Sequence, residues 1–412
     1  MSAAPSPTEF DDLPGPQKAL VNVACERFEA ALQAGQAGTP DTYLDSAPPA
    51  LRSILLRELL ALECEYRGAV NNVIHVGPYS VAGELGRGGF GVVYRAIDAR
   101  DGATYALKVP HPSVLVDPAF HARFRREAEA AARLEHQNII RIHEVKADGP
   151  ASYLAAEYVA GPTLAEWIAE RMAGGTPVGV REAAELVAAL ADAVQHAHDR
   201  GVLHRDLKPS NVLLEGRGVG GPDSSLPIPK ITDFGLARLG DGNDELSRSG
   251  QIVGTPAYMA PEQVAGSRRA VSPRTDVYAL GIILFELLAG RPPFAGTPGM
   301  EMLIRVLRDD PPDLRKLRRD VPADLEAVCF TCLEKNPDRR YASARDLAND
   351  LRRFLAGDRT RVRPPGRLRR TGRWLRRRPF AGAAIAAAVF LLGAAGIHTY
   401  RVEVVNAALT AA

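Results

Sequence analysis

Six short motifs follow one another in a fixed order along the chain, and this order constrains the fold more than any other feature of the sequence. They read Gly-Arg-Gly-Gly-Phe-Gly-Val-Val at 86–93, Ala-Leu-Lys at 106–108, His-Arg-Asp-Leu-Lys-Pro-Ser-Asn at 204–211, Asp-Phe-Gly at 233–235, Ala-Pro-Glu at 260–262 and Asn-Pro-Asp-Arg-Arg at 336–340. One such string can arise by chance. Six in succession indicate a single domain that uses them together.

The sequence around the first motif predicts strands, and the later part of the chain predicts helices. Residues 79–85 and 92–97 alternate like strands on either side of the glycines, and Asp101-Gly102 predicts a hairpin turn into a strand over 104–109. A helix is expected over 120–134, and the chain becomes mainly helical after Leu164. The Gly- and Pro-rich stretch between Leu214 and Lys230 predicts a surface loop.

The three glycines Gly86, Gly88 and Gly91 occupy a six-residue pattern that dinucleotide-binding folds also use, so alone they are weak evidence. Val93 follows two residues later, and a strand that carries Lys108 comes next. Together these features favour a phosphate-covering loop in which glycine lets the backbone come close.

With all six motifs, the sequence resembles the protein kinases, specifically the eukaryotic-like (Hanks-type) serine/threonine kinases of bacteria, over residues 79–356. The resemblance implies an α+β bilobal fold, with a small β-rich N-lobe and a large helical C-lobe. It implies transfer of the γ-phosphate of ATP to protein Ser/Thr hydroxyls, with Mg²⁺ as the metal and Mn²⁺ as an alternative. Lys208 is the residue that favours serine/threonine over tyrosine specificity.

The resemblance also assigns nucleotide-binding residues. Three apolar side chains would cover the adenine from above and one would lie below it, while Lys108 would meet the triphosphate. Glu127 would pair with Lys108, and Glu129, about 200° away on the same helix, would be solvated. The complete nucleotide-binding set is Leu85, Gly86, Gly88, Gly91, Val93, Ala106, Lys108, Glu157, Val159 and Leu213.

The catalytic assignments lie on the third and fourth motifs. Asp206 would accept or orient the proton of the attacking hydroxyl, and Lys208 would neutralise charge on the transferred phosphate. Asn211 and Asp233 would hold magnesium. His204 and Phe234 are expected to pack, not to act as acid or base.

Regulation is expected to involve Arg205, which in related kinases grips a phosphate on the activation loop. Ser247 and Ser249 are the candidate autophosphorylation sites, although both serines also suit a polar loop. Thr255 is expected to line the substrate pocket and to bond Asp206 and Lys208.

Three structural expectations accompany these assignments. Glu262 should pair with Arg340, and Asp276 should cap the backbone of the catalytic loop. Ala156 stands where kinases commonly carry a bulky residue, and Ala131 faces the same region, so a void is expected behind the nucleotide site.

The N-terminal part divides into a mobile segment, 1–16, and a helical extension, 17–70. One helix would present Leu20, Val23, Ala24 and Phe28 on one face. A second would present Leu51, Ile54, Leu55, Leu59, Leu62 and Tyr66. A regulatory or docking module and a simple packing extension are both open. The N-terminus has neither a basic start nor an apolar core, so no signal peptide is expected.

The C-terminal part predicts a membrane anchor. Ten arginines and no acidic residue lie between Arg359 and Arg378, within a basic segment over 357–379. Residues 380–400 follow without a formally charged side chain, and at 1.5 Å per residue they would span roughly 30 Å. We expect a single-pass helix in the cell membrane, with the kinase domain in the cytoplasm and the arginines on anionic lipid, although an interfacial helix is the alternative. Small residues in the span allow a homodimer.

The short tail over 401–412 is too small for a sensor domain, so sensing is expected on the inside, unless the chain is cut short. Cys329 and Cys332 are expected to be buried thiols in a helix. The expected partners are ATP and protein substrates, and no nucleic acid. Two other functions stay open: a catalytically weak scaffold that recruits partners through 17–70, and a small-molecule kinase, which the Ala-Pro-Glu motif and the activation loop disfavour.

Overall fold

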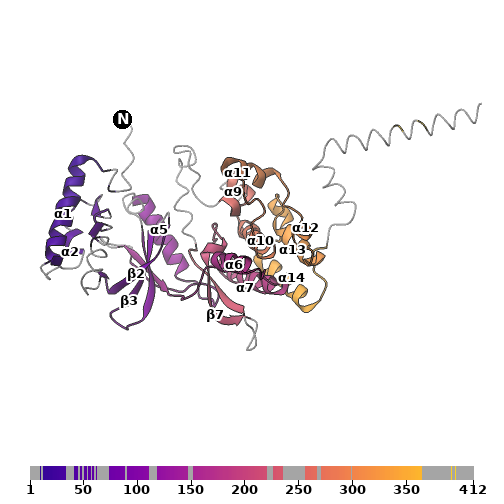
Figure 1. Cartoon of the computed structure of the whole chain (residues 1–412), viewed down its shortest axis with the longest axis horizontal. Coiled ribbons are helices and arrows are strands. Elements are labelled where there is room, and N and C mark those ends of the chain that lie inside the picture. The colour runs from indigo at the N-terminus through magenta and orange to yellow at the C-terminus, as the bar shows by residue number, and fades with distance from the viewer. Residues whose placement is uncertain are drawn as a thin grey trace, which may run out of the picture. The chain divides into compact units, whose positions relative to one another are not determined.

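The computed structural model of the chain (Figure 1) divides into two units, Met1–Arg361 and Val362–Ala412. The structure describes residues 10, 13–33, 41–44, 47, 48, 51, 52, 54–56, 58, 59, 62, 74–88, 91–110, 118–146, 152–219, 226–234, 256–266, 271–297, 299–363, 391 and 395. The second unit is therefore described at only four positions, and the account of the fold concerns the first.

A six-stranded antiparallel sheet forms the first lobe, with the strand order β1-β2-β3-β4-β6-β5. The strands are β1 Ile74–Val76, β2 Tyr79–Gly88, β3 Gly91–Asp98, β4 Thr104–Pro110, β5 Ile142–Lys146 and β6 Tyr153–Glu157. The three strands predicted around the glycine motif are all confirmed. Gly102 takes a φ of +72° in the predicted turn, where the Asp101 carboxylate accepts a hydrogen bond from the amide of Ala103 at 2.8 Å.

Helix α5, Pro118–Ala131, is the helix of this lobe and ends three residues before the predicted boundary. The amides of Arg133 and Leu134 bond carbonyls only three residues back, so the chain tightens there and leaves the α-helical path.

The second lobe is mainly helical, as expected, and carries one two-stranded hairpin. Its elements are α6 Leu164–Ala173, α7 Val180–His198, β7 Val212–Val219, β8 Leu226–Ile231, α9 Pro261–Val264, α10 Pro273–Ala289, α11 Gly299–Arg308, α12 Leu314–Leu317, α13 Ala323–Cys332 and α14 Ala344–Ala356. Helix α10 is buried around most of its circumference, so it lies at the centre of this lobe. Cys329 and Cys332 are fully buried in α13, which confirms the prediction for both thiols.

The stretch between Leu214 and Lys230 differs from the prediction. Much of it extends β7 and β8 instead of forming a loop, and Glu215 pairs with Ile228 and Val219 with Leu226. Cross-strand pairing satisfies backbone hydrogen-bonding groups that a loop would leave to solvent. The prediction from Gly and Pro content did not take this pairing into account.

The N-terminal extension begins with helices α1, Gly15–Gln33, and α2, Asp41–Leu44. The predicted buried face of α1 was wrong in part: Leu20 and Val23 are 53% and 48% exposed. The buried face instead consists of Val21, Ala24, Phe28 and Leu32, which also follow helical spacing. This face contributes to one apolar core with residues of the sheet, among them Val76, Tyr79 and Val81.

The second predicted face agrees with the structure where it is described. Leu51, Ile54, Leu55 and Leu59 are buried and Leu62 is half-buried, whereas Tyr66 lies outside the described residues. The extension therefore shares its core with the small lobe, which is the packing role that the sequence left open beside a docking role.

The predicted membrane span over 380–400 lies outside the described residues except at positions 391 and 395. Within the described part of the chain, no helix combines the length and the apolar character needed to cross a bilayer.

Candidate active site

The strand register gathers the predicted nucleotide-binding residues on one face of the sheet. Val93 on β3 is paired with Lys108 on β4, and Ala106 is paired with Ala156 on β6. Directly paired residues of antiparallel strands point to the same face, and so do residues two apart along a strand. Val93, Ala106 and Lys108 therefore share a face, as the sequence predicted. On β2, Leu85 leaves 47% of its surface exposed.

Strand β6 ends at Glu157, and the segment that follows it, which joins the lobes, contributes Val159. Val159 is buried in one apolar cluster with Ala156, and Leu213 of β7 packs against that cluster. The Glu157 carboxylate accepts a hydrogen bond from Lys230, which also pairs with Glu215 at 3.1 Å. Because its carboxylate is bound to Lys230, we expect Glu157 to meet a nucleotide through its backbone. Lys230 was not singled out from the sequence, although it lies three residues before Asp233.

The catalytic loop brings three predicted residues into direct contact. Lys208 Nζ donates to Asp206 Oδ2 at 2.8 Å, and Asn211 Nδ2 donates to the Asp206 backbone oxygen at 2.8 Å. The Asn211 amide nitrogen is thus used within the loop, which leaves its oxygen as the atom for a cation.

Lys108 is 9% exposed, and its ammonium group donates to Asp233 Oδ1 at 2.7 Å. This contact replaces the predicted pair with Glu127, which is not formed in the structure. A buried ammonium needs a carboxylate in contact, and Asp233 supplies it. Burial would raise the pKa of Asp233, but Lys108 outweighs that effect and holds it below the usual range. Glu129 is exposed and lies 3.8 Å from Arg125, as the prediction of a solvated side chain requires.

The backbone of the catalytic loop is held by Asp276 of α10. Asp276 accepts hydrogen bonds from the amide of His204 at 2.9 Å and from that of Arg205 at 2.8 Å, which confirms the predicted cap. Burial would raise the pKa of Asp276, but the hydrogen bond from His198 helps to hold it below the usual range. His204 is fully buried, and its ring lies 4.8 Å from that of Phe234, so both pack as predicted.

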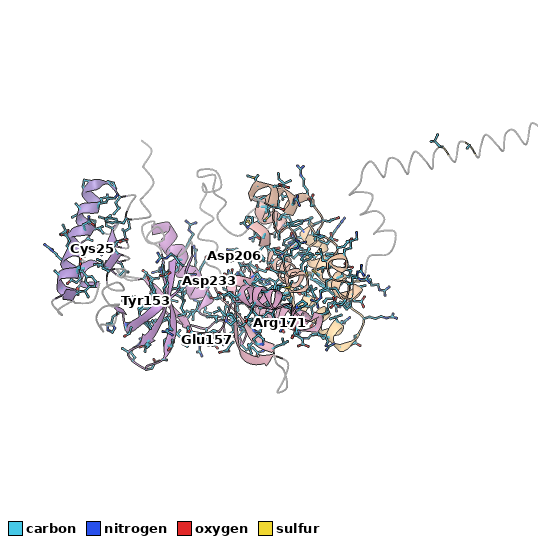
Figure 2. All side chains as sticks on the ribbon, in the orientation of Figure 1. Cys25, Tyr153, Glu157, Arg171, Asp206 and Asp233 are labelled. Carbon is cyan, nitrogen blue, oxygen red and sulfur yellow. The ribbon has the colours of Figure 1, made fainter. Side chains whose placement is uncertain are left out.

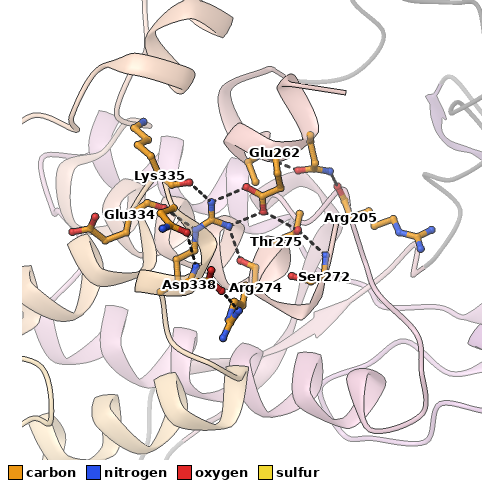
Figure 3. Close-up of polar contacts among 12 residues, drawn as sticks. Arg205, Glu262, Ser272, Arg274, Thr275, Glu334, Lys335 and Asp338 are labelled. Carbon is orange, nitrogen blue, oxygen red and sulfur yellow. Dashed lines mark hydrogen bonds and ion pairs between the residues drawn. The ribbon is translucent and has the colours of Figure 1, made fainter. Parts of the chain in front are cut away.

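Behind the catalytic loop, a buried ion pair joins two distant motifs (Figure 3). Both terminal nitrogens of Arg340 donate to the Glu262 carboxylate at 2.7 Å, and the side chains are 0% and 5% exposed. Thr275 donates to the same carboxylate at 2.9 Å. The predicted Glu262–Arg340 pair is therefore confirmed.

The glycine motif is constrained by its neighbouring strand. A Cβ on Gly91 would come 2.1 Å from the Val109 carbonyl oxygen, and the φ of +154° is one that side-chain-bearing residues rarely adopt. A Cβ on Gly86 would meet nothing within 4 Å. The need for glycine at position 91 thus comes from the close approach of β4.

A cavity of about 30 Å³ lies behind the site, large enough for a water-sized group. Ala131 and Ala156 line it together with Leu154, Asp233 and Phe234. The void expected from the two alanines is confirmed, and larger neighbours such as Phe234 limit its size.

Ser247, Ser249 and Thr255 lie outside the described residues. Figure 2 shows where Asp206 and Asp233 lie in the chain.

The residues of the site fit MgATP. Asp233 and Asn211 offer carboxylate and amide oxygens, the ligand atoms that Mg²⁺ prefers. Lys108 and Lys208 supply two ammonium groups for phosphate oxygens. Leu85 and the apolar sheet face of Val93 and Ala106 can cover a flat aromatic base.

Comparison with known proteins supports this chemistry. The family model for the protein kinase domain matches residues 79–351. Serine/threonine-protein kinase Pkn1 of Myxococcus xanthus is 38% identical over 283 residues, covering 69% of this chain and 39% of the relative. Serine/threonine-protein kinase PknB of Mycolicibacterium smegmatis is 35% identical over 284 residues, covering 68% of this chain and 43% of the relative. The chain thus spans about two fifths of the length of these relatives.

A solved structure agrees with the fold. The crystal structure of the Mycobacterium tuberculosis PknI kinase domain is 31% identical with a TM-score of 0.53, and the match covers 70% of this chain and all of that domain. Protein kinases use ATP and Mg²⁺. Since the family match covers more than half of the chain, and since these relatives are bacterial serine/threonine kinases, the chain belongs to the protein kinase family, among its bacterial serine/threonine members.

Proposed function

We propose that the chain transfers the γ-phosphate of MgATP to serine and threonine hydroxyls of proteins. The observation that carries the proposal is the contact between Asp206 and Lys208 at 2.8 Å, on a loop whose backbone is fixed by Asp276. In one transfer step, the carboxylate can accept the proton of the attacking hydroxyl, and the adjacent ammonium can neutralise the charge of the transferred phosphate.

Bound MgATP would supply a transferable phosphoryl group, and Mg²⁺ would reduce the negative charge of its phosphates. Asp206 orients the substrate hydroxyl and takes its proton. Lys208 would neutralise the charge on the transferred group, and Asn211 and Asp233 would hold the metal. Lys108 binds phosphate oxygens and must exchange its bond to Asp233 for them.

The test is phosphate transfer by the purified full chain, with radiolabelled ATP, Mg²⁺ and a generic acceptor protein. Asp206→Asn should abolish transfer while leaving the unfolding midpoint and ATP binding near those of the wild type. Exposed Asp320→Asn serves as the matched control and should be fully active. Undiminished transfer by Asp206→Asn would refute the catalytic assignment and favour the scaffold alternative.

We further propose that autophosphorylation of Ser247 and Ser249 activates the kinase, through a phosphate held by Arg205. The pairing of Lys108 with Asp233 instead of Glu127 supports a structure that still has to rearrange before transfer. Mass spectrometry of active enzyme should find phosphate on at least one of the two serines, and Arg205→Ala should lower the activity of the phosphorylated form. Absence of phosphate on both serines in active enzyme would contradict the switch.

We also propose that residues 380–400 anchor the chain in the cell membrane as a single span, with the kinase domain in the cytoplasm. The ten arginines that precede this segment support the proposal, since they would be retained on the cytoplasmic side and attract anionic lipid. The full chain should sediment with membranes, whereas a chain ending at Gly357 should stay in the supernatant. Small residues such as Gly382 and Ala386 would allow two spans to pair, which crosslinking in membranes would detect.

A further inference from the structure

Arg205, the residue directly before Asp206, has an unusual backbone conformation. Its φ is +67°, and of the described non-glycine residues only Asp233, at +63°, shares a positive value. Such a conformation is strained for a residue with a side chain, and it persists only where the surroundings hold it. The strained residue directly precedes Asp206, so the groups that hold the Arg205 backbone also determine the position of the Asp206 carboxylate.

Two side chains from different helices hold the polar backbone groups of Arg205. Its amide donates to Asp276 Oδ1 at 2.8 Å. Its carbonyl accepts a hydrogen bond from Gln263 Nε2 at 2.7 Å. Figure 3 shows Arg205 joined to this network, next to the Glu262 pair. The residue is thus fixed from α10 on one side and from α9 on the other.

Gln263 is itself fixed in orientation. Its Oε1 accepts a hydrogen bond from the amide of Ala260 at 2.9 Å, at the start of α9. One partner can only donate and the other can only accept, so the two ends of the amide cannot be exchanged. The preceding residue, Glu262, is anchored by Arg340, which ties Gln263 to the buried ion pair of the large lobe.

We infer that Gln263 is a positioning residue for phosphoryl transfer: its amide holds the Arg205 carbonyl, and through it the carboxylate of Asp206, in the geometry that transfer requires. This inference rests on the proposed kinase function. Gln263 touches neither the sheet face of Val93 and Lys108 nor the segment at Val159 in any described contact, so its loss should change turnover and leave ATP affinity unchanged.

The decisive variant is Gln263→Glu. It keeps the size of the side chain and the acceptor for Ala260, but it sets a carboxylate oxygen against the Arg205 carbonyl. Near pH 8 we expect kcat to fall about tenfold with KM for ATP unchanged, the effect of losing one partly buried hydrogen bond that acts only on the catalytic group. Toward about pH 5.5 a growing fraction of the carboxyl is protonated and can donate to Arg205, so the activity relative to the wild type should recover.

Gln263→Met is the comparison variant, whose side chain carries no hydrogen-bond donor. Its activity relative to the wild type should be reduced by the same factor at every pH. Exposed Gln137→Glu controls for an added charge and should match the wild type. The inference is overturned by a loss in Gln263→Glu that does not depend on pH, by a change in KM for ATP instead of kcat, or by unfolding of both variants, which would make Gln263 structural. An inactive wild type would refute the proposed function as well. An active wild type together with a Gln263→Glu variant of unchanged activity would refute this inference alone.

Discussion

Removing the charge of Glu262 should cost the large lobe much of its stability. The Arg340 side chain is 0% exposed, and it also donates to three carbonyl oxygens, at 2.8 Å to Glu334, 2.9 Å to Arg274 and 3.3 Å to Lys335. Glu262→Gln changes the volume little, but it leaves this guanidinium buried without a counter-charge. It also places an amide N–H₂ where Arg340 now finds an oxygen.

Breaking a buried ion pair from one side costs about 3–5 kcal/mol. The glutamine oxygen can still accept from Thr275 and from one nitrogen of Arg340, so we expect about 3 kcal/mol, the lower end of that range. Domains are stable by only about 5–15 kcal/mol, and a loss of this size should lower the unfolding midpoint by about 6–12 °C.

The assay is thermal unfolding of the wild type and variants, followed by circular dichroism. Exposed Glu301, which pairs with Arg305 at 2.8 Å, offers the matched control, and Glu301→Gln should shift the midpoint by at most about 2 °C. The double variant Glu262→Leu/Arg340→Met removes both charges and should recover much of the loss. If Glu262→Gln melts together with the Glu301→Gln control, the reasoning is wrong.

The pH dependence gives a second check. Burial would raise the pKa of Glu262, but the bond to Arg340 outweighs it and keeps the pKa below its usual range. The pair therefore stabilises the fold at neutral pH, and this contribution is lost as the pH falls through the folded-state pKa. The difference in stability between wild type and Glu262→Gln should shrink on acidification.

Three further changes test other parts of the structure. Ala156→Met should weaken bulky adenine-mimicking inhibitors about tenfold, the value of roughly two methylene-sized groups in the small cavity, and spare ATP turnover; equal inhibition of both forms would argue against access to the cavity. Gly91→Ala should cost about 1–3 kcal/mol and raise KM for ATP, because its Cβ would come 2.1 Å from a carbonyl oxygen; a variant with wild-type stability in urea unfolding would disprove the constraint. The rings of His136 and His196 lie 5.2 Å apart, and burial lowers the pKa of both, so the unfolded chain takes up protons first and stability should fall as the pH drops below about 6.5. His196→Phe should weaken that fall, and an unchanged pH profile of unfolding would exclude the pair as its cause.

The local sequence was sufficient to predict contacts between residues that lie on one loop or one hairpin. Asp206, Lys208 and Asn211 are separated by so few residues that a single turn brings them into contact, and Asp101-Gly102 determines its own turn. The Glu262–Arg340 pair spans 78 residues and was expected only because the family resemblance supplied it.

Tertiary packing decided the contacts for which the sequence offered several equivalent candidates. The sequence offered Glu127 and Glu129 as partners of Lys108, and the structure joins it to Asp233, 125 residues away. Leu20, Val23 and Val21 are all apolar, and only the packing of the folded chain determines that Val21 is buried. Nothing in the local pattern indicated that Gln263 holds Arg205. The sequence by itself determined which chemical groups the catalytic loop contains, because their spacing is short. The folded chain decided which charges meet and which faces are buried, because these depend on how the lobes pack and on where water is excluded.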